Sequence, residues 1–313
     1  MKQVGDGRAL SHRPVMPTEV LEGLAIKAAG RYMDATFGRG GHSHAIIQRL
    51  SDEGRLLALD RDPAAAEWAQ QQFADEPRFL FRRGRFSALG EALAEQGWDD
   101  VDGILLDVGV SSPQLDEAER GFSFMRDGPL DMRMDPDSGE SAAEWLQRAD
   151  EQAITEVLWR YGEERRSRQI ARAIVQARQH EALTRTTQLA ELIAGVMRRR
   201  EPGQHPATRS FQAIRIYLNE ELNELEQALH QAVTALAPGG RLVVISFHSL
   251  EDRLVKQTLR EYARAPAGDR RLPPPPTASL PLRLVGKAQR ASAAEIAANP
   301  RARSAVLRVA EKR

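Results

Sequence analysis

A glycine-rich segment between two apolar segments constrains the fold of this chain more than any other feature. Residues 34–43 (DATFGRGGHS) contain glycines at 38, 40 and 41, and residues 55–60 form an apolar run that ends in a carboxylate. Glycine permits a tight turn and close approach of the backbone to a ligand, and a helix that begins at His42 would present unpaired N–H groups. The pattern predicts strand, turn, helix and strand, which is half of a nucleoside-binding α/β sheet.

The order of the glycines distinguishes between nucleoside cofactors. A dinucleotide fingerprint, G-x-G-x-x-G, would need glycine at position 43, where this chain has Ser43. Asp34 precedes the first glycine, as in methyltransferases that bind S-adenosylmethionine, and its carboxylate suits a cationic amino-acid tail and repels a pyrophosphate. Asp60 ends the next strand, where it can accept hydrogen bonds from both hydroxyls of a ribose. An ordinary tight turn is the alternative for the glycines alone.

The composition predicts a soluble, globular, cytoplasmic protein. The 313 residues are 42% hydrophobic, enough for one large domain or two modest ones, and no apolar run has the length of a signal peptide or a membrane span. Lysine plus arginine equals aspartate plus glutamate, at 44 each. The bulk charge therefore neither supports nor excludes a nucleic-acid partner.

The chain contains no cysteine, which excludes disulfides, thiolate metal sites and a cysteine nucleophile. Carbon-5 of a pyrimidine becomes nucleophilic only after a thiolate adds to the ring, so a methyltransferase of this composition should act on a nitrogen or an oxygen. The few histidines show no spacing typical of metal ligands, and we predict no catalytic metal.

Apolar strands alternate with helical segments, which predicts a parallel sheet covered on both faces. The expected strands are 31–34, 55–60, 78–81, 101–107 and 241–246, and the expected helices between them are 42–50, 63–73 and 89–96. In the tail, a polyproline linker at 272–276 precedes two segments, 282–285 and 305–309, that could pair antiparallel at the sheet edge.

One connection, between the strands at 101–107 and 241–246, is too long for a single crossover. Apolar spacing from Phe211 to Leu236 predicts one crossover helix, and residues 113–208 then form an inserted helical domain. Its expected helices are 141–149, 152–161, 163–179 and 187–200. The domain boundaries that follow are 1–112 and 209–313 for the two parts of the sheet domain and 113–208 for the insert.

Six motifs strongly resemble the bacterial family that methylates the exocyclic N4 of a cytidine in 16S ribosomal RNA. They lie at 34–43, 103–116, 120–124, 128–134, 209–216 and 246–252, and the likeness runs from 12 to 304. The resemblance implies an α/β fold with a Rossmann-like class I methyltransferase sheet and an inserted all-helical domain. It also implies S-adenosylmethionine as methyl donor, and 16S rRNA in the decoding region of the small ribosomal subunit as substrate.

The resemblance also implies a set of donor contacts. Carried over position by position, these are Gly40, Gly41, His42, Asp60, Phe86, Asp107 and Gln114. Phe86 follows the third strand, where it can cover an adenine or equally anchor the core. Asp107 ends the fourth strand, at the edge where such sheets bind ligands, and Gln114 could contact the adenine, the tail of the donor or only solvent.

The acceptor nitrogen poses the chemical difficulty, because its lone pair is delocalised into the cytosine ring. Many amino-methyltransferases carry an Asp/Asn-Pro-Pro-aromatic turn after the fourth strand, but this chain has Asp107-Val108-Gly109-Val110. We therefore assign Asp107 as the tentative catalytic residue, with the backbone carbonyls of 108–112 as the alternative. His248 stays outside the catalytic set, because a lone histidine in a loop is more often structural.

The insert carries arginines suited to phosphate contact, and this favours RNA recognition. They are Arg160, Arg165, Arg166, Arg168, Arg172, Arg178 and Arg198–Arg200. A solvated helix face paired with Glu163 and Glu164 is the alternative. For the whole chain, a non-catalytic small-subunit assembly factor and a nicotinamide-dependent oxidoreductase on the same sheet are the competing functions. The sequence does not fix the oligomeric state.

Overall fold

The computed structural model describes residues 14–197, 205–264 and 280–313. The chain divides into two compact units: the first contains Met1–Gly109 and Glu224–Arg313, and the second contains Val110–Asn223. Among the described residues, no helix is long and apolar enough to cross a membrane.

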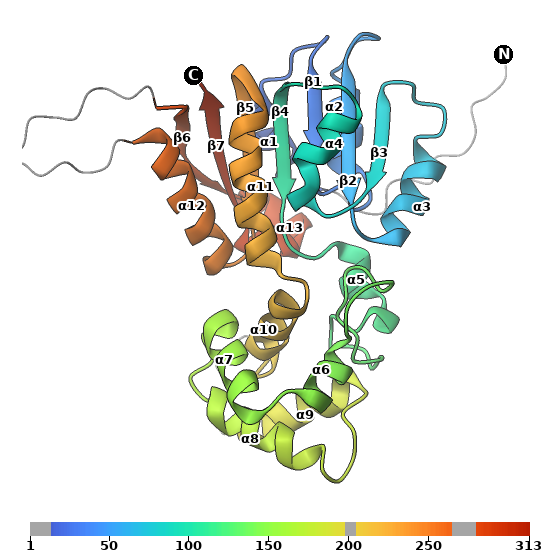
Figure 1. The fold of residues 1–313 in the computed structure, drawn as a ribbon, viewed down its shortest axis with the longest axis vertical. Helices are drawn as coiled ribbons and strands as arrows, with labels where there is room; N and C mark the ends of the chain where they lie inside the picture. Colours follow the sequence, from blue (N-terminus) through green and yellow to red (C-terminus); the bar gives the residue numbers. More distant parts are fainter. Residues whose placement is uncertain (1–13, 198–204, 265–279) are drawn as a thin grey trace, which may run out of the picture. The chain divides into compact units, whose positions relative to one another are not determined.

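Within its described residues, the first unit is built on a seven-stranded sheet of order β3-β2-β1-β4-β5-β7-β6 (Figure 1). The first five strands in this order are parallel, as predicted. The strands are β1 Arg31–Asp34, β2 Arg55–Asp60, β3 Phe79–Arg83, β4 Val101–Asp107, β5 Leu236–Ser246, β6 Leu282–Arg290 and β7 Val306–Lys312. Strands β1, β2 and β4 have the predicted bounds.

Helices cover both faces of this sheet, which explains why its central strands are apolar throughout. One face packs against α4 (Leu89–Glu95), α11 (Glu221–Ala235) and α12 (Ser249–Ala263) through one core cluster. The other face packs against α1 (Pro17–Leu24), α2 (Gly41–Ile47) and α3 (Pro63–Gln72). Consecutive residues of a strand serve opposite faces, as Ile104 and Leu105 of β4 do.

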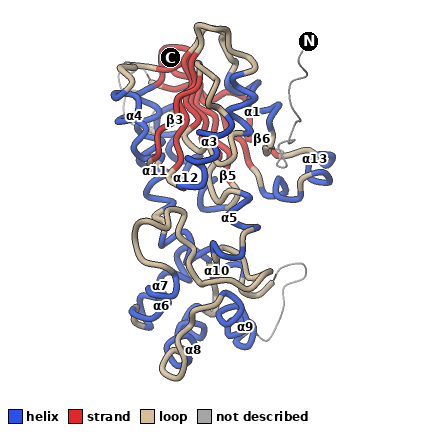
Figure 2. Tube along the Cα trace, turned by 90° about the vertical axis from the view of Figure 1, so that its right-hand side faces the viewer, coloured by secondary structure: helices blue, strands red, loops and turns tan. Residues whose placement is uncertain are grey.

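The predicted antiparallel pair in the tail is confirmed. Strand β7 pairs antiparallel with both β5 and β6, so it lies between them, and β6 forms the edge of the sheet (Figure 1). Figure 2 shows the strands of the sheet in red, with α4 and α11 on one side of them and α1 on the other. A short helix, α13 (Ala293–Ala298), and a 3-10 turn, η3 (Pro300–Ser304), connect β6 to β7.

The second unit is helical and has its own apolar core around Trp145. Its helices are α5 Ser112–Asp116, α6 Ala142–Arg148, α7 Glu151–Gly162, α8 Ser167–Ala177, α9 Thr186–Val196 and α10 Thr208–Leu218, with a 3-10 turn, η2, at Ala118–Arg120. Helix α8 starts four residues later than predicted, because Glu163 adopts a left-handed conformation with φ 50° and ends α7. The predicted extension of α9 through residues 198–200 lies outside the described residues.

The single crossover helix predicted from Phe211 to Leu236 is wrong. Helix α10 ends at Leu218, α11 begins at Glu221, and Glu220 between them has φ 52°. The apolar spacing continues across the break, so periodicity alone does not reveal it. Because α10 packs against α7, the second unit extends to Asn223, beyond the predicted end of the insert at residue 208.

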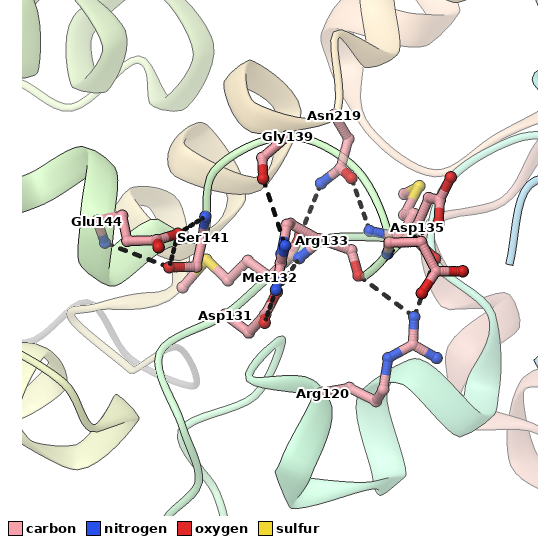
Figure 3. A network of polar contacts seen from close by, with 11 residues as sticks. Arg120, Asp131, Met132, Arg133, Asp135, Gly139, Ser141, Glu144 and Asn219 are labelled. Carbon is pink, nitrogen blue, oxygen red and sulfur yellow. Dashed lines mark hydrogen bonds and ion pairs between the residues drawn. The ribbon is translucent and has the colours of Figure 1, made fainter. Parts of the chain in front are cut away.

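Asn219 holds this break in place (Figure 3). Its side-chain oxygen accepts a hydrogen bond from the Met134 N–H at 2.8 Å, and its amide nitrogen donates to the carbonyls of Met132 at 2.8 Å and Arg215 at 2.9 Å. The same loop is fixed by Arg133, which binds the Asp131 carboxylate at 2.7 Å. A buried amide that satisfies several backbone groups replaces the helical hydrogen bonds lost at the break.

Replacing Asn219 with Ala should destabilise the second unit by about 2–4 kcal/mol, because buried backbone groups lose their partners. Urea unfolding followed by tryptophan fluorescence measures this effect. The control is Gln169→Ala on the exposed surface of α8, which should change stability by less than about 0.5 kcal/mol. Equal stabilities for the two variants would contradict the role given to Asn219.

Candidate active site

Three carboxylates end three neighbouring parallel strands of the first unit. Asp34 ends β1, Asp60 ends β2 and Asp107 ends β4. Asp34 is in register with Ala58 of β2 and with Leu105 of β4, so Asp60 and Asp107 each lie two residues further along. The carboxyl edge of a parallel sheet is where such folds bind ligands, and the structure therefore brings these predicted residues together.

The glycine turn between β1 and α2 is shaped by its left-handed residues. Gly38 has φ 55° and Gly40 has φ 71°, and a Cβ at Gly40 would lie 2.7 Å from the ring of Phe37. The Gly38 N–H donates to the Asp60 carboxylate at 2.8 Å, which ties the turn to the end of β2. Helix α2 then begins at Gly41 with His42 in its first turn, as the sequence predicts.

Asp34 is buried beneath this turn. Its carboxylate accepts hydrogen bonds from Ser43 Oγ at 2.7 Å and from the Thr36 N–H at 3.2 Å. Burial raises the pKa of Asp34, and the bond from Ser43 opposes this effect. Ser43, which replaces the third glycine of a dinucleotide fingerprint, thus supports a buried carboxylate.

Asp60 is held as a hydrogen-bond acceptor at the end of β2. Its two oxygens accept from the backbone N–H groups of Gly38, at 2.8 Å, and Asp62, at 2.9 Å. Burial raises the pKa of Asp60 to about 6, although these two hydrogen bonds lower it. The side chain is therefore mainly ionised at neutral pH and becomes protonated in mildly acidic solution.

His42 and Asp107 form the polar centre of this edge. His42 Nε2 lies 3.4 Å from Asp107 Oδ2, and the Asp107 backbone N–H donates to Thr36 Oγ1 at 2.7 Å. Burial lowers the pKa of His42, but the Asp107 carboxylate, with contributions from Asp34 and Glu295, outweighs burial and raises the pKa above 6.5.

Three buried polar atoms of this pair have no hydrogen-bond partner among the described residues: both ring nitrogens of His42 and Oδ1 of Asp107. Of these, His42 Nε2 meets Asp107 Oδ2 only at ion-pair distance. Buried polar groups are nearly always satisfied, so unpartnered atoms at one edge indicate a place for a polar ligand. A nucleoside cofactor with a charged amino-acid tail meets this requirement.

Phe86 follows β3 and opens a short 3-10 turn, η1 (Phe86–Ala88), that packs partly against the core. The neighbours of Phe86 are fixed from α11. Glu224 is buried and binds Arg85 Nη1 at 2.7 Å and Ser87 Oγ at 2.5 Å. Two helical turns further along α11, the Gln231 side chain accepts a hydrogen bond from the Gly90 N–H at 2.9 Å and donates one to the Ser87 carbonyl at 2.5 Å.

Sequence reasoning missed Glu224 and Gln231. They lie more than 130 residues from the segment that they hold, and only their separation of seven residues, which places both on one face of a helix, could have indicated a shared role.

Gln114 and His248 have structural partners. Gln114 is in the second unit, where it is buried and its side-chain oxygen accepts from the Ser111 N–H at 2.9 Å to cap α5. The interpretation of Gln114 as a solvated loop residue is therefore wrong. His248 caps α12, and its Nε2 lies 3.0 Å from Glu251 Oε1.

A doubly covered parallel sheet with a glycine turn and acidic strand ends defines an enzyme class that binds a nucleoside cofactor. The chain belongs to the MraW methylase family, whose sequence profile matches residues 9–313. The resemblance found in the motifs is thus confirmed. The chain is a methyltransferase that uses S-adenosylmethionine as donor, and the oxidoreductase alternative falls away.

Curated relatives are similar over nearly the whole chain. A protein of Thiobacillus denitrificans named ribosomal RNA small subunit methyltransferase H is 61% identical, with 96% of this chain and 97% of the relative covered. A protein of the same name from Stenotrophomonas maltophilia is 59% identical, with 96% and 93% covered. Among solved structures, an rRNA-methylase described as putative from Clostridium thermocellum has 11% identity, a TM-score of 0.44, and coverage of 97% of this chain and 100% of the other.

Replacing Ser43 with Ala should destabilise the first unit by about 1.5–3 kcal/mol where Asp34 is ionised, because a buried carboxylate loses a hydrogen bond. Burial raises the pKa of Asp34, whereas the hydrogen bond from Ser43 lowers it, and this second effect fixes the sign. The bond stabilises the ionised form, so the loss is largest at high pH and diminishes as Asp34 is protonated.

Urea unfolding of both proteins at about pH 5 and about pH 8 measures this difference. A loss that is smaller at the higher pH would contradict the assignment of the Ser43–Asp34 hydrogen bond.

Proposed function

We propose that this protein transfers a methyl group from S-adenosylmethionine to the exocyclic N4 of a cytidine in the decoding region of 16S rRNA. The unpartnered polar atoms of His42 and Asp107, at the carboxyl edge of the sheet, carry the proposal. The names of the relatives support small-subunit rRNA as the substrate class. The absence of cysteine favours a nitrogen over carbon-5 of the pyrimidine.

The donor is assigned to the edge formed by Gly40, Gly41, His42 and Asp60. The turn at Gly40 and Gly41 leaves no room for side chains there, since Cβ atoms would meet Phe37 and Pro14. The ionised Asp60 accepts hydrogen bonds from ribose hydroxyls. Phe86, held by the α11 contacts to its neighbours, covers the adenine. Gln114 is kept as a donor contact from the second unit on the resemblance alone.

Bound S-adenosylmethionine supplies an electrophilic methyl group, and the protein must align the acceptor nitrogen with it. Asp107 Oδ1 is buried and free to accept a hydrogen bond from the amine. Such a bond favours the pyramidal form of the nitrogen, in which the lone pair is available. His42 Nε2 lies 3.4 Å from the other oxygen of Asp107, within ion-pair distance. The proton leaves to solvent after transfer.

Incubation with labelled donor and unmodified small subunits, followed by mapping of the modified nucleotide, tests the proposal. Label at N4 of a cytidine in the decoding region supports it. Label at another atom or nucleotide overturns the assigned specificity. Tight binding of the subunit without label in the RNA supports the assembly-factor alternative.

Replacing Asp107 with Asn or Ala should lower the rate of methyl transfer by at least about 10²-fold, because the fixed acceptor for the amine is lost. Single-turnover rates at saturating donor measure this step, and calorimetry measures donor affinity separately. Asp99→Asn, an exposed carboxylate variant, serves as the control. Full activity would remove Asp107 from the mechanism, and a defect confined to donor affinity would defeat its role toward the acceptor.

The second unit is proposed to hold the RNA. Some of its arginines bind other groups of the same unit and are therefore weaker candidates for phosphate contact. Arg166 donates to the Val196 carbonyl at 2.9 Å, and Arg178 donates to the carbonyls of Leu146 and Ala149. These side chains stabilise the unit. Arg172 lies 3.7 Å from Glu151 in an exposed ion pair, and Arg160 lies over the ring of Tyr161.

Arg165 and Arg168 are the better phosphate contacts. Both are exposed, and neither has an ion pair or side-chain hydrogen bond with the described part of the chain. The alternative, a pairing with Glu163 and Glu164, therefore does not apply to Arg165 and Arg168. Arg198–Arg200 lie outside the described residues.

Charge reversal at Arg165 and Arg168 should weaken RNA binding and reduce its salt dependence by about one to two released counterions. Binding to 16S rRNA over a range of salt concentrations measures the slope. Arg49→Glu, at an exposed arginine of the first unit, is the matched control. A slope equal to that of the control would count against these contacts.

A further inference from the structure

The edge strand β6 is interrupted by a bulge. Its pairing with β7 shifts register between Val285 and Gln289, because three residues of β6 lie opposite Arg308 alone. Gly286 opens the bulge with φ 67°, and a Cβ there would meet no atom within 4 Å. Bulges of this kind bend a strand away from its partner and leave backbone groups unpaired.

The bulge forms one wall of a small, open hollow, and α12 forms the other. Its lining residues contribute cations and apolar groups but no carboxylate: Lys256, Leu259 and Arg260 from α12, Leu284, Val285, Gly286, Lys287 and Ala288 from β6, and Arg308 and Val309 from β7. Positive charge therefore surrounds this hollow.

Of these four cations, only Arg308 is compensated. It binds the Asp252 carboxylate at 2.8 Å and 3.1 Å. Lys256, Arg260 and Lys287 have no ion pair or side-chain hydrogen bond with the part of the chain that the structure describes. Three uncompensated like charges around one hollow repel each other, and a bound anion would relieve this repulsion.

The strand leads from the hollow to the active edge of the sheet. Gln289 of β6 is in register with Leu307 of β7, which pairs with Ile245 of β5, which in turn pairs with Asp107 of β4. Three strand spacings separate the two ends of this row, or about 14 Å. The exposed residues 287–290 include Lys287 and Arg290 and extend the positive charge toward this edge.

We propose that the hollow between α12 and the β6 bulge binds a backbone phosphate of the RNA substrate. The inference rests on the proposed function and adds a contact surface on the first unit, separate from Arg165 and Arg168 of the second unit. A backbone phosphate accepts hydrogen bonds from Lys256, Lys287 and Arg260, which line the hollow. The charged row along β6 then guides the strand toward the edge where Asp107 lies.

Lysines on an edge strand have a second use, since they prevent edge-to-edge pairing between copies of a protein. That explanation accounts for Lys287 but not for Lys256 and Arg260, which lie on α12. It predicts a different result on charge reversal, namely self-association with RNA binding unchanged.

The test is binding of the full chain to deproteinised 16S rRNA over a range of salt concentrations, for the wild type, Lys256→Glu/Lys287→Glu and the control Arg49→Glu. The double variant should bind about tenfold more weakly at low salt. Its slope of log affinity against log salt concentration should correspond to about two fewer released counterions, whereas the control should release less than one fewer. Donor affinity should not change, which shows that the fold is intact.

A slope of the double variant equal to that of the control overturns the proposal, and self-association detected by ultracentrifugation then supports the edge-protection explanation. If the glutamates prevent folding, Lys256→Gln/Lys287→Gln should still reduce the slope, and an unchanged slope in this variant also overturns the proposal. Methyl transfer by the wild type to unmodified small subunits is measured in parallel. Its absence would refute the proposed function, whereas methylation with unchanged slopes would refute only the phosphate site.

Discussion

The in-register alignment of β1, β2 and β4 is the constraint on which the rest of the site depends. Because side chains at the ends of parallel strands meet at one edge, three carboxylates distant in sequence come together. Each has a different environment. Asp34 is buried against Ser43, Asp60 accepts two backbone N–H groups, and Asp107 faces His42 with one oxygen unpartnered. One strand arrangement therefore yields a structural carboxylate, a candidate ribose acceptor and a candidate amine acceptor.

Much of the first unit could be predicted from the sequence, because its signals are local. Apolar runs bounded by glycine and aspartate gave the exact limits of three strands, and the glycine turn indicated where α2 begins. The antiparallel pair of the tail was also predicted, although its strands are longer than expected. The break between α10 and α11 could not be predicted in this way, since the apolar spacing runs on through Asn219 while a buried amide supplies the missing hydrogen bonds.

Contacts between segments that are distant in the sequence were the second kind of feature that could not be predicted. Glu224 and Gln231 fix the segment around Phe86 from another helix, and nothing near them in the sequence indicates this. The arginines in and around α8 looked equivalent as a cluster, yet Arg166 and Arg178 bind backbone carbonyls whereas Arg165 and Arg168 are exposed. The hollow beside Gly286 depends on a register shift between β6 and β7. These features follow from tertiary packing rather than from local propensity.

Calorimetric titration of S-adenosylmethionine into the wild type and Asp60→Asn, from about pH 8 down to about pH 5, tests the central claim that this edge holds the donor. The pKa of Asp60 is about 6, and its ionised form is the proposed acceptor of the ribose hydroxyls, so wild-type affinity should fall as the pH drops below that value. The variant should bind more weakly at high pH and show a flatter dependence. Affinities that are equal for the two proteins across this range, or no binding by the wild type, would contradict the account.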